Sequence, residues 1–307
     1  MRIGIPRAML YYRDGALWQT FFEALGHEVV LSRPTDRQIL ELGIRYAIDE
    51  ACLACKVYLG HVASLLDRCD SLFVPRVANF GEEGIFCTKF EALPDMTQNS
   101  FRAERLRVLS CEIDEKRKLG EQQAFLRLGR RLGASARQSR EAYHAGVLAR
   151  RAQQAHQLDE QRQALQRPGL KILLVGHSYL VYDAYVGEPV RRILEHMHIT
   201  PLYACAAEQT ASRALGQRMS PTVPWTVSRE LLGAVVGLKD QVDGIILMSA
   251  FPCGPDSMVN ELLTRKLHDR PILVLTMDAQ DGSAGLETRL ESFVDILQFR
   301  QEAACHG

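Results

Sequence analysis

Residues 3–32 of the chain, IGIPRAMLYYRDGALWQTFFEALGHEVVLS, predict a strand, a helix and a second strand in that order. The first strand is short and apolar, and it ends at Pro6 because proline cannot donate to a sheet ladder. Residues 8–25 place apolar side chains at near-helical spacing, and Gly26 marks the end of that helix. The stretch 28–32 contains two adjacent valines and forms the next strand. A strand–helix–strand order is typical of a parallel α/β sheet.

The same alternation continues along the chain and predicts an α/β protein with two parallel-sheet domains. The expected helices cover residues 36–45, 57–66 and 188–197, and the expected strands cover residues 71–74, 171–175, 242–248 and 271–276. In such sheets, ligands gather at the carboxyl ends of the strands. Three segments fall there, at residues 176–179, 249–257 and 278–285, and we expect the two domains to face each other across a cleft.

Residues 112–166 differ from both flanks in composition, because arginine, glutamine, alanine and glutamate dominate and glycine is sparse. One or two long helices are expected here. Their simplest role is that of a solvated connector packed across both domains, and a dedicated partner-binding arm is the alternative. The predicted division is an N-terminal α/β domain over residues 1–111, a helical connector over 112–167 and a C-terminal α/β domain over 168–307.

Composition excludes several classes of function. The 307 residues contain 37 Lys and Arg residues against 37 Asp and Glu residues, so the net charge is zero and nucleic acid is a poor partner. The longest apolar runs fall far short of the ~20 residues that a membrane helix needs, so no membrane partner is expected. Gly4 and Pro6 interrupt the N-terminus where a secretion signal would be apolar, which predicts a cytoplasmic protein.

The eight cysteines would then lie in a reducing compartment, where metal or redox chemistry is the leading use of thiols. Four of them fall at predicted loops or helix starts: Cys52 and Cys55 in a C-x-x-C, Cys87, and Cys253. Soft thiolates select zinc, copper(I) or an iron–sulfur cluster. One compact pair with two distant single cysteines favours a cluster over structural zinc, and ordinary buried thiols remain a third interpretation. Cys253 also opens a predicted helix, whose dipole stabilises an anionic thiolate.

Other candidate residues have simpler structural interpretations. Cys69 and Cys205 flank apolar segments and are expected to be core thiols. His61 falls within a predicted helix and suits a buried structural role. His177 and Tyr179 follow a predicted strand, where they can shape a pocket, although a plain loop role is commoner for such a histidine. No G-x-G-x-x-G or Walker pattern occurs, so nucleotide binding by this chain is not supported.

Several long motifs occur in an order that is familiar from one protein family. After the opening stretch, they are DEACLACKVYLGHV (49–62), FVPRV (73–77), CTKFEALPDM (87–96), GHSYLVYDAY (176–185), FPCGPDSMVNEL (251–262) and AGLETRLESFVDIL (284–297). With them, the chain resembles the acyl-CoA dehydratase activase-related proteins, a branch of the 2-hydroxyacyl-CoA dehydratase and double-cubane-cluster superfamily. The resemblance covers most of residues 1–110 and 170–297.

The resemblance implies two Rossmann-like domains with an oxygen-sensitive iron–sulfur cluster held by cysteines in the cleft. The family's recurring cysteines fall on Cys52, Cys87 and Cys253, which suggests a 4Fe–4S cluster with one iron left open, and a double-cubane cluster is the alternative. This chain has Ala54 and Cys55 where many relatives have a proline–valine or similar pair. Cys55 is therefore available as a fourth ligand, which would close the cluster and leave it as an electron carrier.

The resemblance also implies a partner and a reaction type. Relatives receive electrons at very low potential from an ATP-hydrolysing activase, which is itself an iron–sulfur homodimer. The expected function is low-potential electron transfer or reductive chemistry, with a homodimer or a homologous second subunit as the expected assembly. One alternative is a 2-hydroxyacyl-CoA dehydratase subunit. The other alternative, from a different class, is a non-catalytic scaffold that binds zinc.

Overall fold

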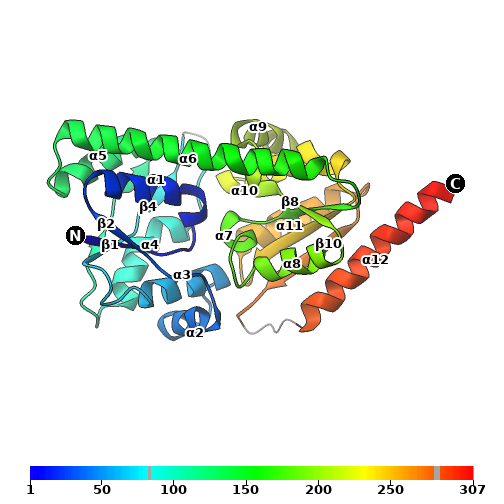
Figure 1. The fold of residues 1–307 in the computed structure, drawn as a ribbon, viewed down its shortest axis with the longest axis horizontal. Helices are drawn as coiled ribbons and strands as arrows, with labels where there is room; N and C mark the ends of the chain where they lie inside the picture. Colours follow the sequence, from blue (N-terminus) through cyan, green and yellow to red (C-terminus); the bar gives the residue numbers. More distant parts are fainter. Residues whose placement is uncertain (82–83, 280–283, 307) are drawn as a thin grey trace. The chain divides into compact units, whose positions relative to one another are not determined.

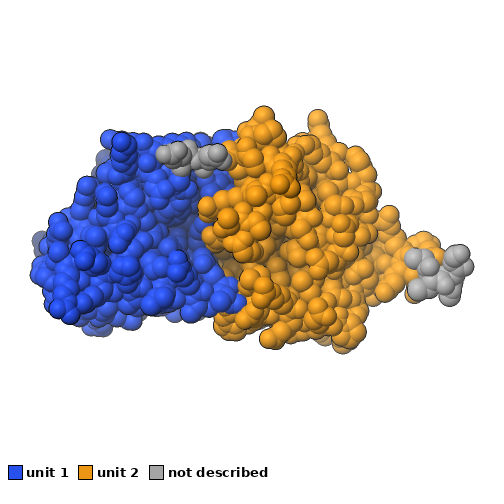
Figure 2. Space-filling model, turned by 90° about the horizontal axis from the view of Figure 1, so that it is seen from above, with its two compact units in different colours: residues 1–155, 224–226 blue, residues 156–223, 227–307 orange. Residues whose placement is uncertain are grey.

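The chain folds into two units, each of which is built around its own parallel sheet. The computed structural model describes residues 1–81, 84–279 and 284–306. Unit 1 comprises residues 1–155 and 224–226, and unit 2 comprises residues 156–223 and 227–307, coloured blue and orange in Figure 2. The expectation of an α/β protein with parallel sheets is confirmed, and the topology is consistent with two Rossmann-like domains.

The sheet of unit 1 has the order β2-β1-β3-β5, and every neighbouring pair is parallel. Its strands are β1 (Arg2–Ile5), β2 (Glu28–Leu31), β3 (Ser71–Phe73) and β5 (Val108–Leu109). Its helices are α1 (Tyr11–Ala24), α2 (Arg37–Tyr46), α3 (Leu53–Ala63), α4 (Thr88–Ser100) and α5 (Glu121–Arg131), labelled in Figure 1. A second, two-stranded parallel sheet pairs β4 (Arg76–Asn79) with β6 (Glu112–Asp114).

The sheet of unit 2 has the order β10-β9-β7-β8 and is also entirely parallel. Its strands are β7 (Lys171–Val175), β8 (Thr200–Tyr203), β9 (Gly244–Ala250) and β10 (Ile272–Met277). Its helices are α7 (Ser178–Val181), α8 (Glu188–His196), α9 (Gln209–Met219), α10 (Thr226–Leu238, with Thr226 in unit 1), α11 (Gly254–Lys266) and α12 (Ala284–His306). The two sheets therefore share one strand order, because in each the second strand lies on one side of the first and the third lies on the other.

Residues 112–167 form two helices, but the first of them starts later than the composition predicts. The prediction of helix from residue 112 is wrong, because buried Ile113 of β6 pairs with Val77 of β4 and α5 begins only at Glu121. The second helix, α6 (Ala136–Leu165), is one continuous rod in Figure 1, and the boundary between the units falls within it. Among the described residues, no helix has the length and apolarity needed to cross a bilayer.

A buried ion network attaches α6 to the helices of unit 1. The guanidinium of Arg150 donates to Asp14 of α1 at 2.9 Å and to both oxygens of Glu121 of α5 at 2.7 and 2.9 Å. The Tyr143 hydroxyl donates to the same Glu121 carboxylate at 2.8 Å. Since three helices contribute to a partly buried, bidentate arrangement, the network fixes their mutual positions more firmly than exposed ion pairs would.

Two helix pairs approach to backbone contact, one in each unit, and each does so through two glycines. In α2 and α3, a Cβ on Gly43 would lie 1.7 Å from the Lys56 carbonyl oxygen, and one on Gly60 would lie 1.9 Å from the Ile39 carbonyl oxygen. In α9 and α10, the corresponding glycines lie at the same spacing along the chain and meet the opposite helix as closely (Gly216 and Gly233). Only residues without a side chain fit at these crossings.

Replacing Gly60 by alanine should therefore destabilise unit 1. The added methyl group would force α2 and α3 apart, and we expect the free energy of unfolding to fall by about 2–3 kcal/mol, as for an overpacked core. Urea unfolding measures the change. Gly237→Ala in α10 is the control, because a Cβ there meets only Leu215 at 3.6 Å. Equal stability of Gly60→Ala and wild-type protein would contradict the close approach.

Candidate functional site

The C-x-x-C of the sequence lies at the N-terminus of α3. Cys52 is the N-cap, with extended backbone, and its carbonyl accepts from the amides of Cys55 at 2.9 Å and Lys56 at 3.1 Å. The sequence predicts that this helix starts at residue 57, but it starts four residues earlier, at Leu53. Its first turn brings the sulfur atoms of Cys52 and Cys55 to 3.5 Å, within hydrogen-bond distance. Cys52 is partly exposed, whereas Cys55 is fully buried.

The environment of Cys55 favours its neutral thiol. The hydrogen bond with Cys52 raises the pKa of Cys55 most, and burial raises it further. Two groups at the start of α4 also influence this pKa: the charge of Lys89 lowers it, and the Cys87 thiol raises it. Cys55 is therefore a neutral thiol at neutral pH.

Cys87 lies at a helix start of the same kind, as the N-cap of α4. Its thiol is near enough to Cys55 to raise the pKa of that residue, and all three cysteines belong to unit 1. The positive end of each helix dipole favours a thiolate at the N-cap residue, which is Cys52 in α3 and Cys87 in α4. As the side chains lie, however, no group of three or more His, Cys, Asp or Glu residues among those described has the geometry to hold a metal ion.

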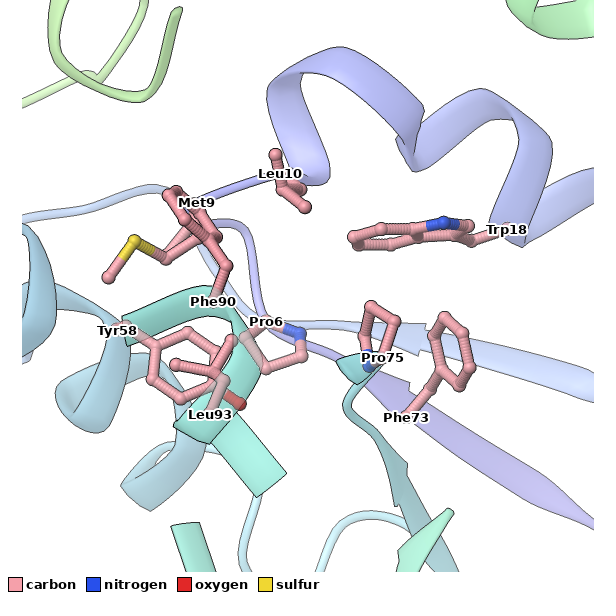
Figure 3. A pocket seen from close by; sticks show the side chains of 10 residues that line it. Pro6, Met9, Leu10, Trp18, Tyr58, Phe73, Pro75, Phe90 and Leu93 are labelled. Atoms are coloured by element: carbon pink, nitrogen blue, oxygen red, sulfur yellow. The ribbon is translucent and has the colours of Figure 1, made fainter. Parts of the chain in front are cut away.

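An apolar pocket lies near Cys55, which interacts with the pocket residue Tyr58, and the sequence analysis missed it. Figure 3 shows the side chains that line it and labels all of them except that of Ala8. The pocket has a volume of about 10 Å³, the space of about one water molecule, and is lined by Pro6, Ala8, Met9, Leu10, Trp18, Tyr58, Phe73, Pro75, Phe90 and Leu93. The pocket opens between the carboxyl ends of β1 and β3, where the strand order of the sheet reverses. Ligands of open α/β sheets bind at such switch points, and this rule could have found it.

The helices that carry the cysteines also form one wall of the pocket. Tyr58 follows Cys55 by one helical turn, and Phe90 follows Cys87 by the same interval. Residues three apart lie on one face of a helix, so the pocket wall continues the face that carries the thiols. Burial raises the pKa of Tyr58, and its hydroxyl pairs with that of Thr97 at 3.2 Å. The Tyr58 ring therefore stays neutral and contributes an apolar surface to the pocket.

Unit 2 carries a polar group at the equivalent switch point, between β7 and β9. His177 Nε2 lies 2.9 Å from Asp256 Oδ1, and the two residues are 7% and 6% exposed. The Tyr179 ring stacks on the imidazole with centroids 4.8 Å apart and an interplanar angle of 7°. The second carboxylate oxygen, Asp256 Oδ2, is buried and has no hydrogen-bond partner among the described residues. Sequence analysis found His177 and Tyr179 but missed Asp256, which is three residues after Cys253.

Cys253 is the N-cap of α11 and belongs to unit 2. The predicted helix start at Cys253 is confirmed, with Pro255 in the first turn. Its place in the fold matches that of Cys87, since each caps the first helix after the third strand of its sheet. Cys253 as an iron ligand stays a prediction. Of the predicted strand-end segments, 278–285 includes residues 280–283, which lie outside the described part of the chain.

The other residues that the sequence analysis singled out have contacts or burial that suit a structural role. Cys69 donates from its sulfur to the Leu65 carbonyl at 3.4 Å. Burial raises the pKa of Cys205 to about 12, so it remains a neutral thiol. His61 is fully buried and pairs with the Thr35 hydroxyl at 2.9 Å, so its predicted structural role matches its environment.

The buried His61 should make unfolding depend on pH. Burial lowers its pKa from about 6.5 to about 3, so the unfolded chain binds a proton below pH 6.5 that the folded protein does not. Stability should therefore fall as pH decreases through this range, by up to about 1.4 kcal/mol per pH unit from this residue. Urea unfolding between pH 7.5 and 5 should show a shallower decrease for His61→Gln. The exposed His268→Gln is the control, and parallel curves for His61→Gln and wild-type protein would contradict the assignment.

Comparison with known proteins assigns the chain to a family. No curated protein matches it. Among solved structures, it is similar to the SBP FpvC from Pseudomonas aeruginosa in complex with Mn2+ at 13% identity and a TM-score of 0.27, covering 99% of each chain. It is also similar to ZnuA at 11% identity and a TM-score of 0.26, covering 97% of this chain and 98% of that one. Neither TM-score supports an argument about fold or function. Residues 2–205, most of the chain, match the family described as CoA enzyme activase uncharacterised domain (DUF2229), and the chain therefore belongs to that family.

Proposed function

We propose that the chain is an iron–sulfur protein that receives electrons from an ATP-hydrolysing activase and uses them for low-potential electron transfer or reductive chemistry. The observation that carries the proposal is the 3.5 Å approach of the Cys52 and Cys55 sulfur atoms at the start of α3, with Cys87, whose thiol influences the pKa of Cys55, at the start of α4. The family description, which names CoA enzyme activases, supports the choice of partner.

The donor set suits such a cluster. Thiolates are the usual protein ligands of iron–sulfur clusters, and a bound cluster would supply one-electron transfer. Cys52, Cys55 and Cys87 would hold it, with the two helix N-termini stabilising the added negative charge. Lys89 at the start of α4 adds a positive charge nearby. Cys253, which caps the matching helix of unit 2, is the further ligand that the sequence predicts.

The apolar pocket would exclude water from one side of the proposed cluster site. Trp18, Tyr58 and Phe90 present aromatic surface there, and the cavity holds no more than about one water molecule. Electrostatic interactions are stronger where water is excluded, so the dipoles of α3 and α4 would act on the site with little screening. Within unit 2, His177, Tyr179 and Asp256 form the polar group that we assign to substrate contact.

The wider setting follows from the same proposal. An oxygen-sensitive cluster belongs in the reducing cytoplasm, and we place the protein there. Either a second copy or a homologous subunit would complete the assembly. Acyl-CoA binding distinguishes an electron carrier from the alternative of a 2-hydroxyacyl-CoA dehydratase subunit, because the dehydratase subunit would bind acyl-CoA and the electron carrier would not.

Metal analysis of protein purified without oxygen tests the proposal. We expect about four irons and about four acid-labile sulfides per chain, or about eight of each for a double cubane. Cys87→Ser should lose most of the iron. Cys69→Ser is the matched control, because a serine hydroxyl can still donate to the Leu65 carbonyl. Zinc without iron, or no metal in the wild-type protein, would contradict the proposal.

The role of Cys253 is tested separately. Cys253→Ser should lose most of the cluster iron while the protein stays folded, since the side chain makes no capping hydrogen bond to α11 that the substitution would remove. Iron content and circular dichroism of the purified variant measure both properties. Full iron retention would remove Cys253 from the ligand set and leave the thiols of unit 1 as the site.

A further inference from the structure

We propose that Cys52 and Cys55 form a reversible disulfide when their site holds no metal, and that this disulfide closes the site to iron. The first part depends only on the geometry of the two cysteines. The second part rests on the proposed iron–sulfur function. In this proposal, the oxidation state of Cys52 and Cys55 determines whether the site can bind iron.

The distance between the two sulfur atoms already favours the bond. They lie 3.5 Å apart across the first turn of α3, and a disulfide needs about 2 Å. Two cysteines separated by two residues at a helix N-terminus lie on one face of the helix, so rotation of their side chains can close the remaining gap. The amide of Cys55 already donates to the Cys52 carbonyl, which holds the backbone of this turn together.

The two cysteines differ in solvent exposure, and this difference determines which of them reacts first with an oxidant. Cys52 is partly exposed at the N-cap, whereas Cys55 is fully buried beneath it. A small oxidant in solution therefore meets Cys52 first. Buried Cys55, whose sulfur lies 3.5 Å from that of Cys52, can then attack the modified Cys52 sulfur. This combination of an accessible first cysteine and a shielded second one is typical of redox-active C-x-x-C pairs.

A low-molecular-weight disulfide such as glutathione disulfide supplies the oxidising equivalents. The Cys52 thiolate attacks one sulfur of glutathione disulfide, which breaks that bond, releases one glutathione thiolate and forms a mixed disulfide. The Cys55 thiol then gives up its proton and attacks the Cys52 sulfur, which releases the second glutathione. Two protein thiols are thereby oxidised, and one glutathione disulfide is reduced to two glutathiones.

The test uses metal-free full-length protein equilibrated in glutathione buffers of increasing oxidation and then alkylated with iodoacetamide. Trypsin releases both cysteines in one peptide, YAIDEACLACK (46–56), which contains no other cysteine. We expect this peptide to become resistant to alkylation and two hydrogen atoms lighter in mass spectra as the buffer becomes more oxidising. Alkylation of both cysteines at every glutathione ratio would overturn the proposal, and so would a link between this peptide and the one that contains Cys87.

Single substitutions test the order of attack. Cys55→Ser should accumulate a glutathione adduct at Cys52, because no second thiol is present to release it. Cys52→Ser should show at most a small fraction of that adduct at buried Cys55. Cys69→Ser is the control and should form the intramolecular bond as the wild-type protein does. Equal adducts at both positions would contradict the proposed order.

Iron loading separates this inference from the proposed function. Oxidised and re-reduced samples are supplied anaerobically with ferrous iron and sulfide, without added thiol. Loading of the re-reduced sample alone supports both parts. Loading of both samples would overturn closure of the site. If the disulfide forms but neither sample loads, the proposed iron–sulfur function fails, and so does the second part of this inference, while the disulfide itself stands.

Discussion

The crossing of α2 and α3 is the constraint on which the thiol group of unit 1 depends. Gly43 and Gly60 let the two backbones touch, so α3 has one possible depth against α2. That depth fixes the position of α3, whose first turn carries Cys52 and Cys55. It also directs Tyr58 into the pocket beside β1 and β3. A single steric requirement thus positions both the reactive and the apolar parts of the site.

The two units share a backbone arrangement but differ in the residues at their switch points. Both have a four-stranded parallel sheet with one strand order, and both have a helix pair that crosses at two glycines. In unit 1, the switch point is lined by aromatic and aliphatic side chains, with the thiols on the adjoining helices. In unit 2, the switch point holds a buried histidine–carboxylate pair. The shared scaffold therefore leaves the choice of site residues to the loops and helix starts, as is common for α/β folds.

Much of the fold could be predicted because local patterns and tertiary packing agree. The strands β1, β7 and β9 lie in apolar runs that end near proline or glycine, and they were found within one or two residues. Strand β8 was missed because Pro201 interrupts its pattern, which an edge strand tolerates. Cysteine spacing indicated the C-x-x-C at a helix start. The contact of Asp256 with His177 could not be predicted, because it joins residues far apart in sequence and follows from the adjacency of β7 and β9.

The unpaired oxygen of Asp256 would favour ligands that can donate a hydrogen bond to it. Within the described part of the chain, Oδ1 is occupied by His177, while Oδ2 is buried and accepts from nothing. A molecule that enters with a hydroxyl or amine group satisfies this oxygen and relieves its desolvation. A molecule that presents only acceptors cannot donate to this oxygen and leaves it without a partner. Discrimination between ligands at this edge of the sheet would therefore depend on which of them can give a hydrogen bond.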